Sequence, residues 1–176
     1  PSECLFYLSK QNVKSVANIL IGGNDIQARS GAYLYITTAQ LTQLFAGEQT
    51  DNHNRYRYVW NRTLKDVSNR YCAAILKYYF PDETEDQMLY YQIIPMLRMS
   101  EVYLIAIECT ENLVEANQLY ADYMLSHDVV VNENTFASLN DIQNMIVNEY
   151  RREFYAEGQM FYMYKLTNTK NILWNS

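Results

Sequence analysis

The sequence predicts a mainly α fold, in which helix pairs are accompanied by a small antiparallel strand element. From residue 86 onward, apolar residues recur at the three- and four-residue spacing of amphipathic helices. Before that point, residues 55–61 and 71–79 carry the patterns of short strands. With 49% apolar and 19% charged residues among 176, the chain has the composition of a globular protein.

Two regions are expected along the chain. Residues 1–85 are predicted to form an irregular region with short strands and one helix, and residues 86–176 are predicted to form a helical region. We expect them to form one structural unit whose upstream portion is missing, because the chain begins at Pro1 rather than at a methionine.

The first region combines turn signals with short elements. Residues 5–8 and 32–36 are predicted strands, separated by the Gly-Gly-Asn-Asp turn at residues 22–25. Thr38 is a predicted helix N-cap because apolar residues follow it at helical spacing, and Gly47 is expected to close that helix.

Residues 55–61 alternate between two sets of side chains. In a strand the two sets would face opposite sides: Tyr56, Tyr58 and Trp60 against Arg55, Arg57 and Val59. Residues 71–79 are rich in apolar residues and precede Pro81. We expect the two strands to pair antiparallel across a loop at residues 62–70.

The helical region begins with a predicted hairpin of two helices. An apolar stripe marks the first helix: Met99, Val102, Tyr103 and Ala106. Asn112 followed by Glu115 resembles a capping box at the start of the second helix. The short connection at residues 110–111 and the small residues Ala106 and Ala116 are typical of a tetratricopeptide-like pair.

A long helix and a short one are predicted to complete the chain. Ser138 and Asp141 indicate the N-terminus of the long helix. We expect it to stop at Gly158, because glycine adopts a positive φ without steric cost. Residues 161–164 predict the final short helix.

Charge and residue patterns argue against several classes of function. A net charge of −6 without a basic stripe argues against a nucleic-acid partner. No apolar run approaches the roughly 18 residues that a membrane-spanning helix needs. The three cysteines show no metal or redox spacing, and His53 and His127 lie in polar segments without a metal or triad motif. We therefore expect no cofactor and no metal.

Paired carboxylates would be the remaining route to catalysis. Glu101 and Glu108 would share one helix face at a separation of roughly 10 Å, which is at the wide end of glycosidase carboxylate pairs. The arginines of this region favour ion pairing instead. The sequence therefore predicts no catalytic residues, and a protein that is not an enzyme.

Two segments resemble motifs of one family. Residues 97–109, Leu-Arg-Met-Ser-Glu-Val-Tyr-Leu-Ile-Ala-Ile-Glu-Cys, are similar to R-x-A-E-V-Y-L-I-x-A-E-A. Residues 149–165, which contain Glu-Tyr-Arg-Arg-Glu and then Glu-Gly, resemble E-R-R-x-E-x-x-x-E-G-x-x-x-x-D-L-K-R. Both motifs belong to the SusD/RagB family of surface glycan-binding lipoproteins of Bacteroidetes-type bacteria. More loosely, Asn54-Arg55-Tyr56 resembles the D-x-R that precedes the small strand pair in that family.

The chain also departs from the family pattern. Met160, Met163 and Leu166 stand where the family commonly has Arg, Asp and Arg. Ser100 and Ile107 replace alanines. The resemblance covers the last third of a protein that is usually much longer.

The resemblance implies a function, a partner and a location. The chain would be a SusD-like C-terminal region that binds oligosaccharide or polysaccharide without catalysis and delivers it to a SusC-like TonB-dependent transporter. It would lie at the outer membrane, on the cell surface, through a lipid anchor outside this chain. Two alternatives stay open: a peptide-binding RagB-like member, and a helical-repeat scaffold that binds another protein.

The residues that match the family motifs are interpreted as structural. They are Arg98, Glu101, Glu108, Arg151, Arg152, Glu153, Glu157 and Gly158. Because unlike charges lie on helices expected to pack together, we predict a partly buried ion-pair cluster that joins the last long helix to the helix hairpin.

Aromatic residues outside the helices are the candidates for ligand contact, because flat sugar faces pack on aromatic rings. These candidates are Tyr33, Tyr35, Tyr56, Tyr58 and Trp60. The alternative is that the last three of them cover the core.

Overall fold

A computed structural model describes these residues of the chain: 3–8, 35–45, 53–77, 93–170 and 172. The chain divides into two compact units. The first comprises residues 1–43 and 56–98, and the second comprises residues 44–55 and 99–176. Residues 32–34 of the predicted strand at residues 32–36, the turn at residues 22–25 and Gly47 lie outside the described residues.

The fold is mixed α/β, so the prediction of a mainly α, tetratricopeptide-like fold is wrong. Helices take up 48% of the described residues and strands 19%. The strands form two small antiparallel sheets. The prediction failed because one strand, which precedes the helix hairpin, pairs with a segment near the start of the chain, and local sequence patterns do not record such pairing.

A three-stranded antiparallel sheet lies in the first unit. Its strands are β2 (Ile36–Thr37), β4 (Tyr71–Ile75) and β3 (Trp60–Lys65), in the order β2-β4-β3. The predicted strand at residues 71–79 is confirmed over its first five residues, whereas its partner begins at Trp60 rather than at residue 55. Four consecutive β4 residues, from Cys72 to Ile75, are buried, as expected for a central strand.

Local side-chain bonds shape the β3–β4 hairpin. Asp66 accepts hydrogen bonds from the backbone N–H groups of Ser68 and Arg70, and its carboxylate pairs with the Arg70 guanidinium at 2.8 Å. These bonds close the turn around Asn69, which has a φ of 62°.

The second sheet contains two strands. β1 (Cys4–Leu8) pairs antiparallel with β5 (Ile94–Arg98), which places Cys4 opposite Arg98. The predicted strand at residues 5–8 is therefore confirmed. Helical structure was expected from residue 86, but residues 94–98 are extended, and the helix begins only at Met99.

Two short helices differ from the sequence prediction. α2 (Thr38–Leu44) is capped by Thr37, whose hydroxyl accepts from the N–H of Gln40, while the Gln40 side chain accepts from the N–H of Thr37. The N-cap is therefore Thr37 rather than Thr38. Residues 54–58 form a helix, α3 (Asn54–Tyr58), and not the predicted alternating strand.

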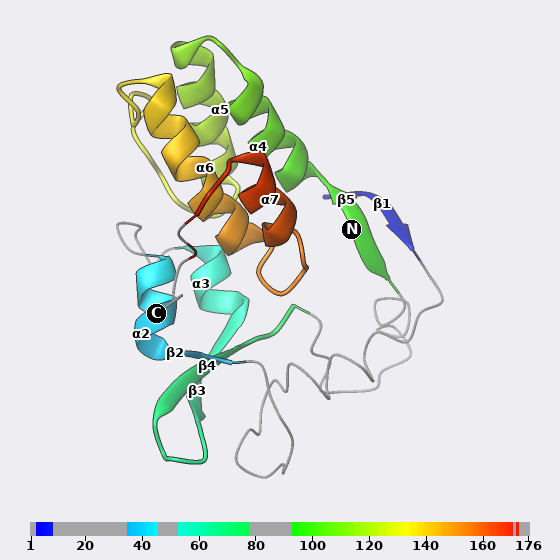
Figure 1. The fold of residues 1–176 in the computed structure, drawn as a ribbon, viewed down its shortest axis with the longest axis vertical. Helices are drawn as coiled ribbons and strands as arrows, with labels where there is room; N and C mark the ends of the chain where they lie inside the picture. The colour runs from blue at the N-terminus through cyan, green and yellow to red at the C-terminus, as the bar shows by residue number, and fades with distance from the viewer. Residues whose placement is uncertain (1–2, 9–34, 46–52, 78–92, 171, 173–176) are drawn as a thin grey trace. The chain divides into compact units, whose positions relative to one another are not determined.

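The second unit is helical. It contains α4 (Met99–Cys109), α5 (Leu113–Leu125), α6 (Leu139–Glu153) and α7 (Met160–Leu166). Figure 1 shows α4, α5 and α6 side by side, with α7 against α6. The predicted hairpin of two helices is α4 and α5.

Both predicted caps are confirmed. The Asn112 side chain accepts from the N–H groups of Val114 and Glu115 at the start of α5. At the start of α6, the Ser138 hydroxyl accepts from the Asp141 N–H and donates to the Asp141 carboxylate. The bonds from backbone N–H groups satisfy donors that the first helical turn would otherwise leave unpaired.

One core fills the space between these helices. Its most deeply buried members are Leu104, Ile107, Ala116, Tyr123, Met124, Val129, Ile142 and Ile146. The buried Asn117 side chain donates to the carbonyl of Phe136 and accepts from its N–H, which holds the α5–α6 connection against α5.

The prediction that Gly158 ends α6 is wrong, whereas its predicted positive φ is confirmed. The helix ends at Glu153 rather than at Gly158. Gly158 does have a positive φ, of 77°, and a Cβ built there would meet no atom within 4 Å. The glycine is therefore required by its backbone conformation and not by close packing.

Candidate functional site

A network of charged side chains is buried inside the second unit. Arg55, Glu149, Arg152 and Glu153 are each at most 7% exposed. Two positive and two negative charges therefore balance one another in an interior where an unpaired charge would be costly.

Glu149 lies at the centre of this network. One of its carboxylate oxygens accepts from Arg55 at 2.7 Å, and the other accepts from Arg152, one turn along α6. Burial alone would raise the pKa of Glu149, but the two guanidinium groups lower it to about 2. Glu149 is therefore held as a carboxylate.

Three further bonds complete the network and join it to neighbouring elements. The Arg55 guanidinium donates to Glu153 at 3.1 Å and to the Tyr123 hydroxyl of α5 at 2.9 Å. The Arg152 Nε donates to the carbonyl of Leu44 at 2.7 Å. The charges thereby tie α6 to α5 and to the segments around residues 44 and 55.

His53 packs against the same arginine. Its Nε2 lies 3.1 Å from Arg55, and because a guanidinium can only donate, that nitrogen must accept. The proton therefore lies on Nδ1, and the ring is neutral. Burial and the Arg55 charge lower the pKa of His53 to about 3.

The buried network has different members from the predicted ion-pair cluster. Arg152 and Glu153 do belong to it, but their partners include Arg55 and Glu149. The other predicted members lie elsewhere: Arg98 ends β5, Glu101 and Glu108 lie on α4, and Arg151 faces Tyr164. Glu157, a further residue of the family motif, follows α6. The local signal for Arg55 was its loose match to the D-x-R motif of the family.

This network is structural, because its charged groups are buried and bond one another.

A candidate for ligand binding lies elsewhere in the second unit, at its surface. A pocket with a volume of about 580 Å³ lies along the outer face of α6, and we call it the polar pocket. Most of its lining side chains carry amide, hydroxyl or charged groups: Glu108, Asn140, Gln143, Asn144, Asn148, Arg151, Thr167 and Thr169.

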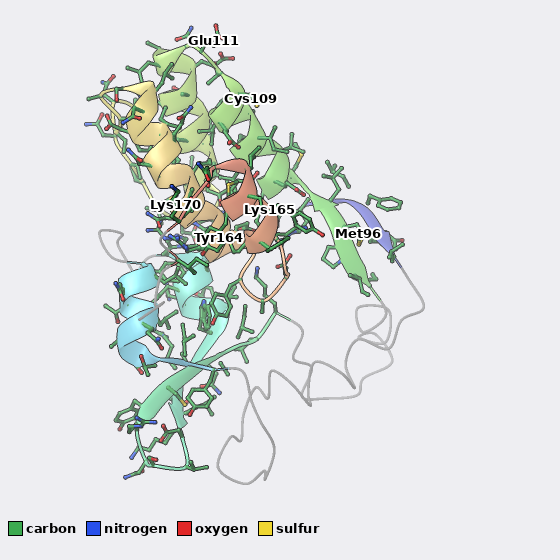
Figure 2. The ribbon with its side chains drawn as sticks, in the orientation of Figure 1. Met96, Cys109, Glu111, Tyr164, Lys165 and Lys170 are labelled. Carbon is green, nitrogen blue, oxygen red and sulfur yellow. The ribbon has the colours of Figure 1, made fainter. Side chains whose placement is uncertain are left out.

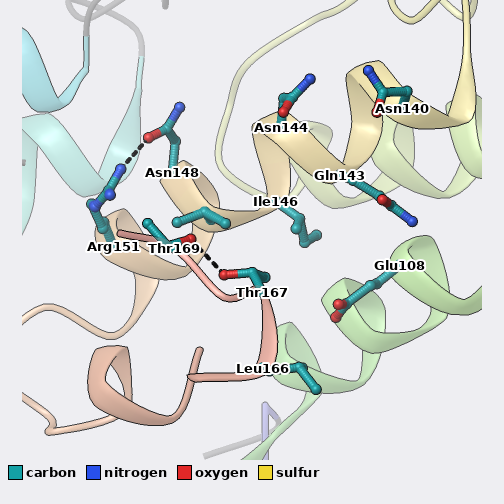
Figure 3. Close-up of a pocket in the computed structure, with 11 residues that line it drawn as sticks. Glu108, Asn140, Gln143, Asn144, Ile146, Asn148, Arg151, Leu166, Thr167 and Thr169 are labelled. Carbon is teal, nitrogen blue, oxygen red and sulfur yellow. Dashed lines mark hydrogen bonds between the residues drawn. The ribbon is translucent and has the colours of Figure 1, made fainter. Parts of the chain in front are cut away.

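The spacing of residues on α6 explains the row of amides. Asn140, Asn144 and Asn148 follow one another at intervals of four residues, so they share one helix face (Figure 3). The amides of Asn140, Gln143 and Asn144 bond to no other group within the described part of the chain. Their donors and acceptors are therefore available to a ligand.

Two threonines and a carboxyl group also line the polar pocket. Thr167 and Thr169 lie just after α7, and their hydroxyl oxygens are 2.6 Å apart (Figure 3). Glu108 comes from the last turn of α4 and is half-buried. Burial raises the pKa of Glu108, and no basic side chain among the described residues forms an ion pair with it.

Arg151 lies at the other end of the pocket from Glu108 (Figure 3). Its guanidinium donates to the Asn148 side chain (Figure 3) and, at 2.9 Å, to the hydroxyl of Tyr164, a residue of α7 that Figure 2 labels. The guanidinium also lies over the Tyr164 ring, 5.3 Å from its centroid. These contacts fix Arg151 in place.

A second pocket adjoins the polar pocket and shares Glu108, Gln143 and Leu166 with it. Its volume is about 660 Å³, and its lining combines two carboxyl groups with aromatic and aliphatic side chains: Glu101, Ile105, Glu108, Tyr150, Tyr162, Met163 and Leu166. No Lys or Arg lines it within the described residues.

The aromatic residues predicted to contact a ligand differ in their exposure to solvent. Trp60 is 4% exposed and Tyr56 is 9% exposed, so neither ring offers a face for stacking, and the predicted contact role is wrong for both. Tyr35 packs against the small cluster around Leu64. Tyr58 is 64% exposed and remains a candidate, and Tyr33 lies outside the described residues.

The described residues hold no group of three His, Cys, Asp or Glu side chains that could bind a metal ion. No helix among them is long and apolar enough to cross a membrane. Comparison with family models, curated proteins and solved structures finds no match to the chain.

Proposed function

We propose that this chain binds oligosaccharide without catalysis and delivers it to a SusC-like TonB-dependent transporter at the bacterial cell surface. The observation that carries the binding role is the polar pocket, whose lining combines the free amides of α6 with the hydroxyl oxygens of Thr167 and Thr169. Sites that hold sugars need this combination of paired donors and acceptors, because each sugar ring presents several hydroxyl groups.

The geometry of α6 suits an extended ligand. Side chains four residues apart on a helix lie roughly 6 Å apart along its axis. Asn140, Asn144 and Asn148 therefore place three amides in succession, although the Asn148 oxygen already accepts from Arg151, and a chain of linked sugar rings can meet them in turn. An exposed row of hydrogen-bonding groups favours reversible capture over chemical conversion.

The family resemblance supports the rest of the proposal. Its two motifs fall on α4 and on the end of α6 with α7, and these elements supply Glu108, Arg151 and Leu166 to the polar pocket. The transporter partner, the outer-membrane location and a lipid anchor outside this chain are what membership in the SusD/RagB family would entail.

A glycan-array screen of the full chain tests the binding role. We expect saturable binding to at least one oligosaccharide class, and roughly tenfold or greater loss of that binding in Gln143→Ala/Asn144→Ala, which removes two free amides. Asn134→Ala is the matched control, because Asn134 is an exposed amide residue that does not line the pocket. Absence of any hit by a folded chain would contradict the proposal.

Exposed apolar side chains favour a second candidate, a scaffold that binds a protein or peptide. Tyr162 is 69% exposed and Leu166 is 71% exposed on α7, and Ile105 of α4 lines the same second pocket. A negative glycan array, together with saturable binding to defined peptides that Leu166→Ser abolishes, would favour this candidate.

A further inference from the structure

Glu108 is the one carboxyl group that the polar pocket and the second pocket share. It is half-buried, its side chain points toward the part of the pocket near Leu166 and Thr167 (Figure 3), and no basic side chain of the described chain forms an ion pair with it. A carboxylate that is partly removed from water without a counter-charge is destabilised, and a cation placed beside it would relieve that cost.

The surroundings of Glu108 favour a cation over an anion. Glu101 lies two turns away on α4 and lines the same second pocket, together with the rings of Tyr150 and Tyr162. Aromatic rings attract cations through their negative faces. Arg151, the one basic residue of the polar pocket lining, lies at the opposite end and donates to Asn148 and Tyr164.

We infer that the preferred ligand is an oligosaccharide that contains an amino sugar, and that Glu108 binds its ammonium group while the α6 amides bind neighbouring hydroxyls. This inference rests on the proposed function and adds a ligand class to the same pocket. An acidic sugar would instead bring its carboxylate toward Glu101 and Glu108 on a chain whose net charge is −6. Like-charge repulsion would oppose that binding.

Two oligosaccharides that differ only at nitrogen test the inference. Glucosamine oligomers carry free amino groups, whereas the corresponding N-acetylglucosamine oligomers share the same backbone and linkage but are neutral. Calorimetric titration at about pH 6 should give a Kd roughly tenfold lower for the free amine, as expected for one charge-assisted hydrogen bond.

A variant then assigns the effect to Glu108. Glu108→Gln keeps the size and hydrogen-bonding shape of the side chain but removes its charge, so it should weaken binding of the amine roughly tenfold and leave the acetylated ligand unchanged. Glu133→Gln is the control, because Glu133 is exposed in the α5–α6 connection, lines neither pocket and changes the net charge equally.

The outcomes distinguish a failure of the role inferred for Glu108 from a failure of the proposed sugar-binding function. Equal affinity of the wild-type chain for both oligosaccharides, or equal weakening by Glu108→Gln and Glu133→Gln, would overturn the role of Glu108 while leaving sugar capture intact. If neither these oligomers nor any array glycan bound the folded chain, the proposed function itself would fail. The wild-type comparison stands even if Glu108→Gln does not fold.

Discussion

The guanidinium of Arg55 donates to Glu149 Oε2 at 2.7 Å, joining residues that lie 94 positions apart in the sequence. Both side chains are buried, and Glu149 also accepts from Arg152. A contact of this kind makes the folding of α6 depend on a segment near residue 55, because neither charge can be left alone in the interior.

Removal of Arg55 should therefore destabilise the protein strongly. Arg55→Ala removes a guanidinium donor from both Glu149 and Glu153, so we expect the free energy of unfolding to fall by about 3–5 kcal/mol. Arg57→Ala is the matched control, because Arg57 is exposed and lies over the ring of Tyr58. Urea denaturation of both variants measures the difference, and similar midpoints would contradict the role of Arg55.

The adjacent residues Arg151 and Arg152 should respond differently to the same substitution. Arg152→Met removes a bond to Glu149 and the bond to the Leu44 carbonyl, at a cost of about 1–3 kcal/mol because Arg55 still neutralises Glu149. Arg151→Met should cost less than about 1 kcal/mol, because Arg151 is only partly buried. Equal melting temperatures for the two variants would show that Arg152 is not the structural partner of Glu149.

Stability should fall with acid in two overlapping ranges. His53 is neutral in the folded protein, with a pKa lowered from 6.5 to about 3, so its contribution is complete above pH 6.5 and declines as the pH falls toward 3. Glu149, whose pKa is lowered from 4.5 to about 2, contributes above pH 4.5 and loses that contribution as the pH falls toward 2. Both residues therefore predict lower stability in acid.

The variant His53→Gln isolates the first range. Between pH 6.5 and 4.5, one proton taken up only by the unfolded state lowers stability by about 1.4 kcal/mol per pH unit. The wild-type chain should show a slope that is steeper than that of His53→Gln by about this amount in chemical denaturation at several pH values. Parallel pH profiles would mean that His53 takes up protons equally in both states.

The stability lost on substitution of Gly158 should depend on how readily the new residue adopts a positive φ. Its φ of 77° disfavours residues with a Cβ, although a Cβ would meet no atom within 4 Å. Gly158→Ala should therefore lower the free energy of unfolding by about 1–2 kcal/mol. Gly158→Asn should cost less, because asparagine adopts positive φ more readily than alanine. A larger loss for asparagine than for alanine in thermal denaturation would contradict this explanation.

The sequence was most informative where the structural signal is local. The caps at Asn112 and Ser138 and the positive φ of Gly158 each depend on a few neighbouring residues, and all three predictions are confirmed. The strand at residues 94–98 depends instead on its pairing with β1, so no local pattern could reveal it. Its hydrogen-bonding partners lie near the start of the chain.

Residues 54–58 show why short patterns mislead. Alternating aromatic and basic residues fit a strand, but the burial of Arg55 depends on its pairing with Glu149 and Glu153 far along the chain, and the segment forms a turn of helix.

The polar pocket could not be predicted for a related reason. The amides of α6 resemble an ordinary solvated helix face until folding brings Glu108 and Thr167 beside them.

Nuclear magnetic resonance of the side-chain amides tests the central claim most directly. Addition of an oligosaccharide identified on the array should shift the side-chain NH₂ signals of Asn140, Gln143 and Asn144, which line the polar pocket. The signal of Asn134, which does not line the pocket, should remain in place. If the ligand binds but shifts only residues remote from α6, such as the exposed Tyr58, or if nothing shifts at saturating ligand, then the polar pocket is not the site of capture.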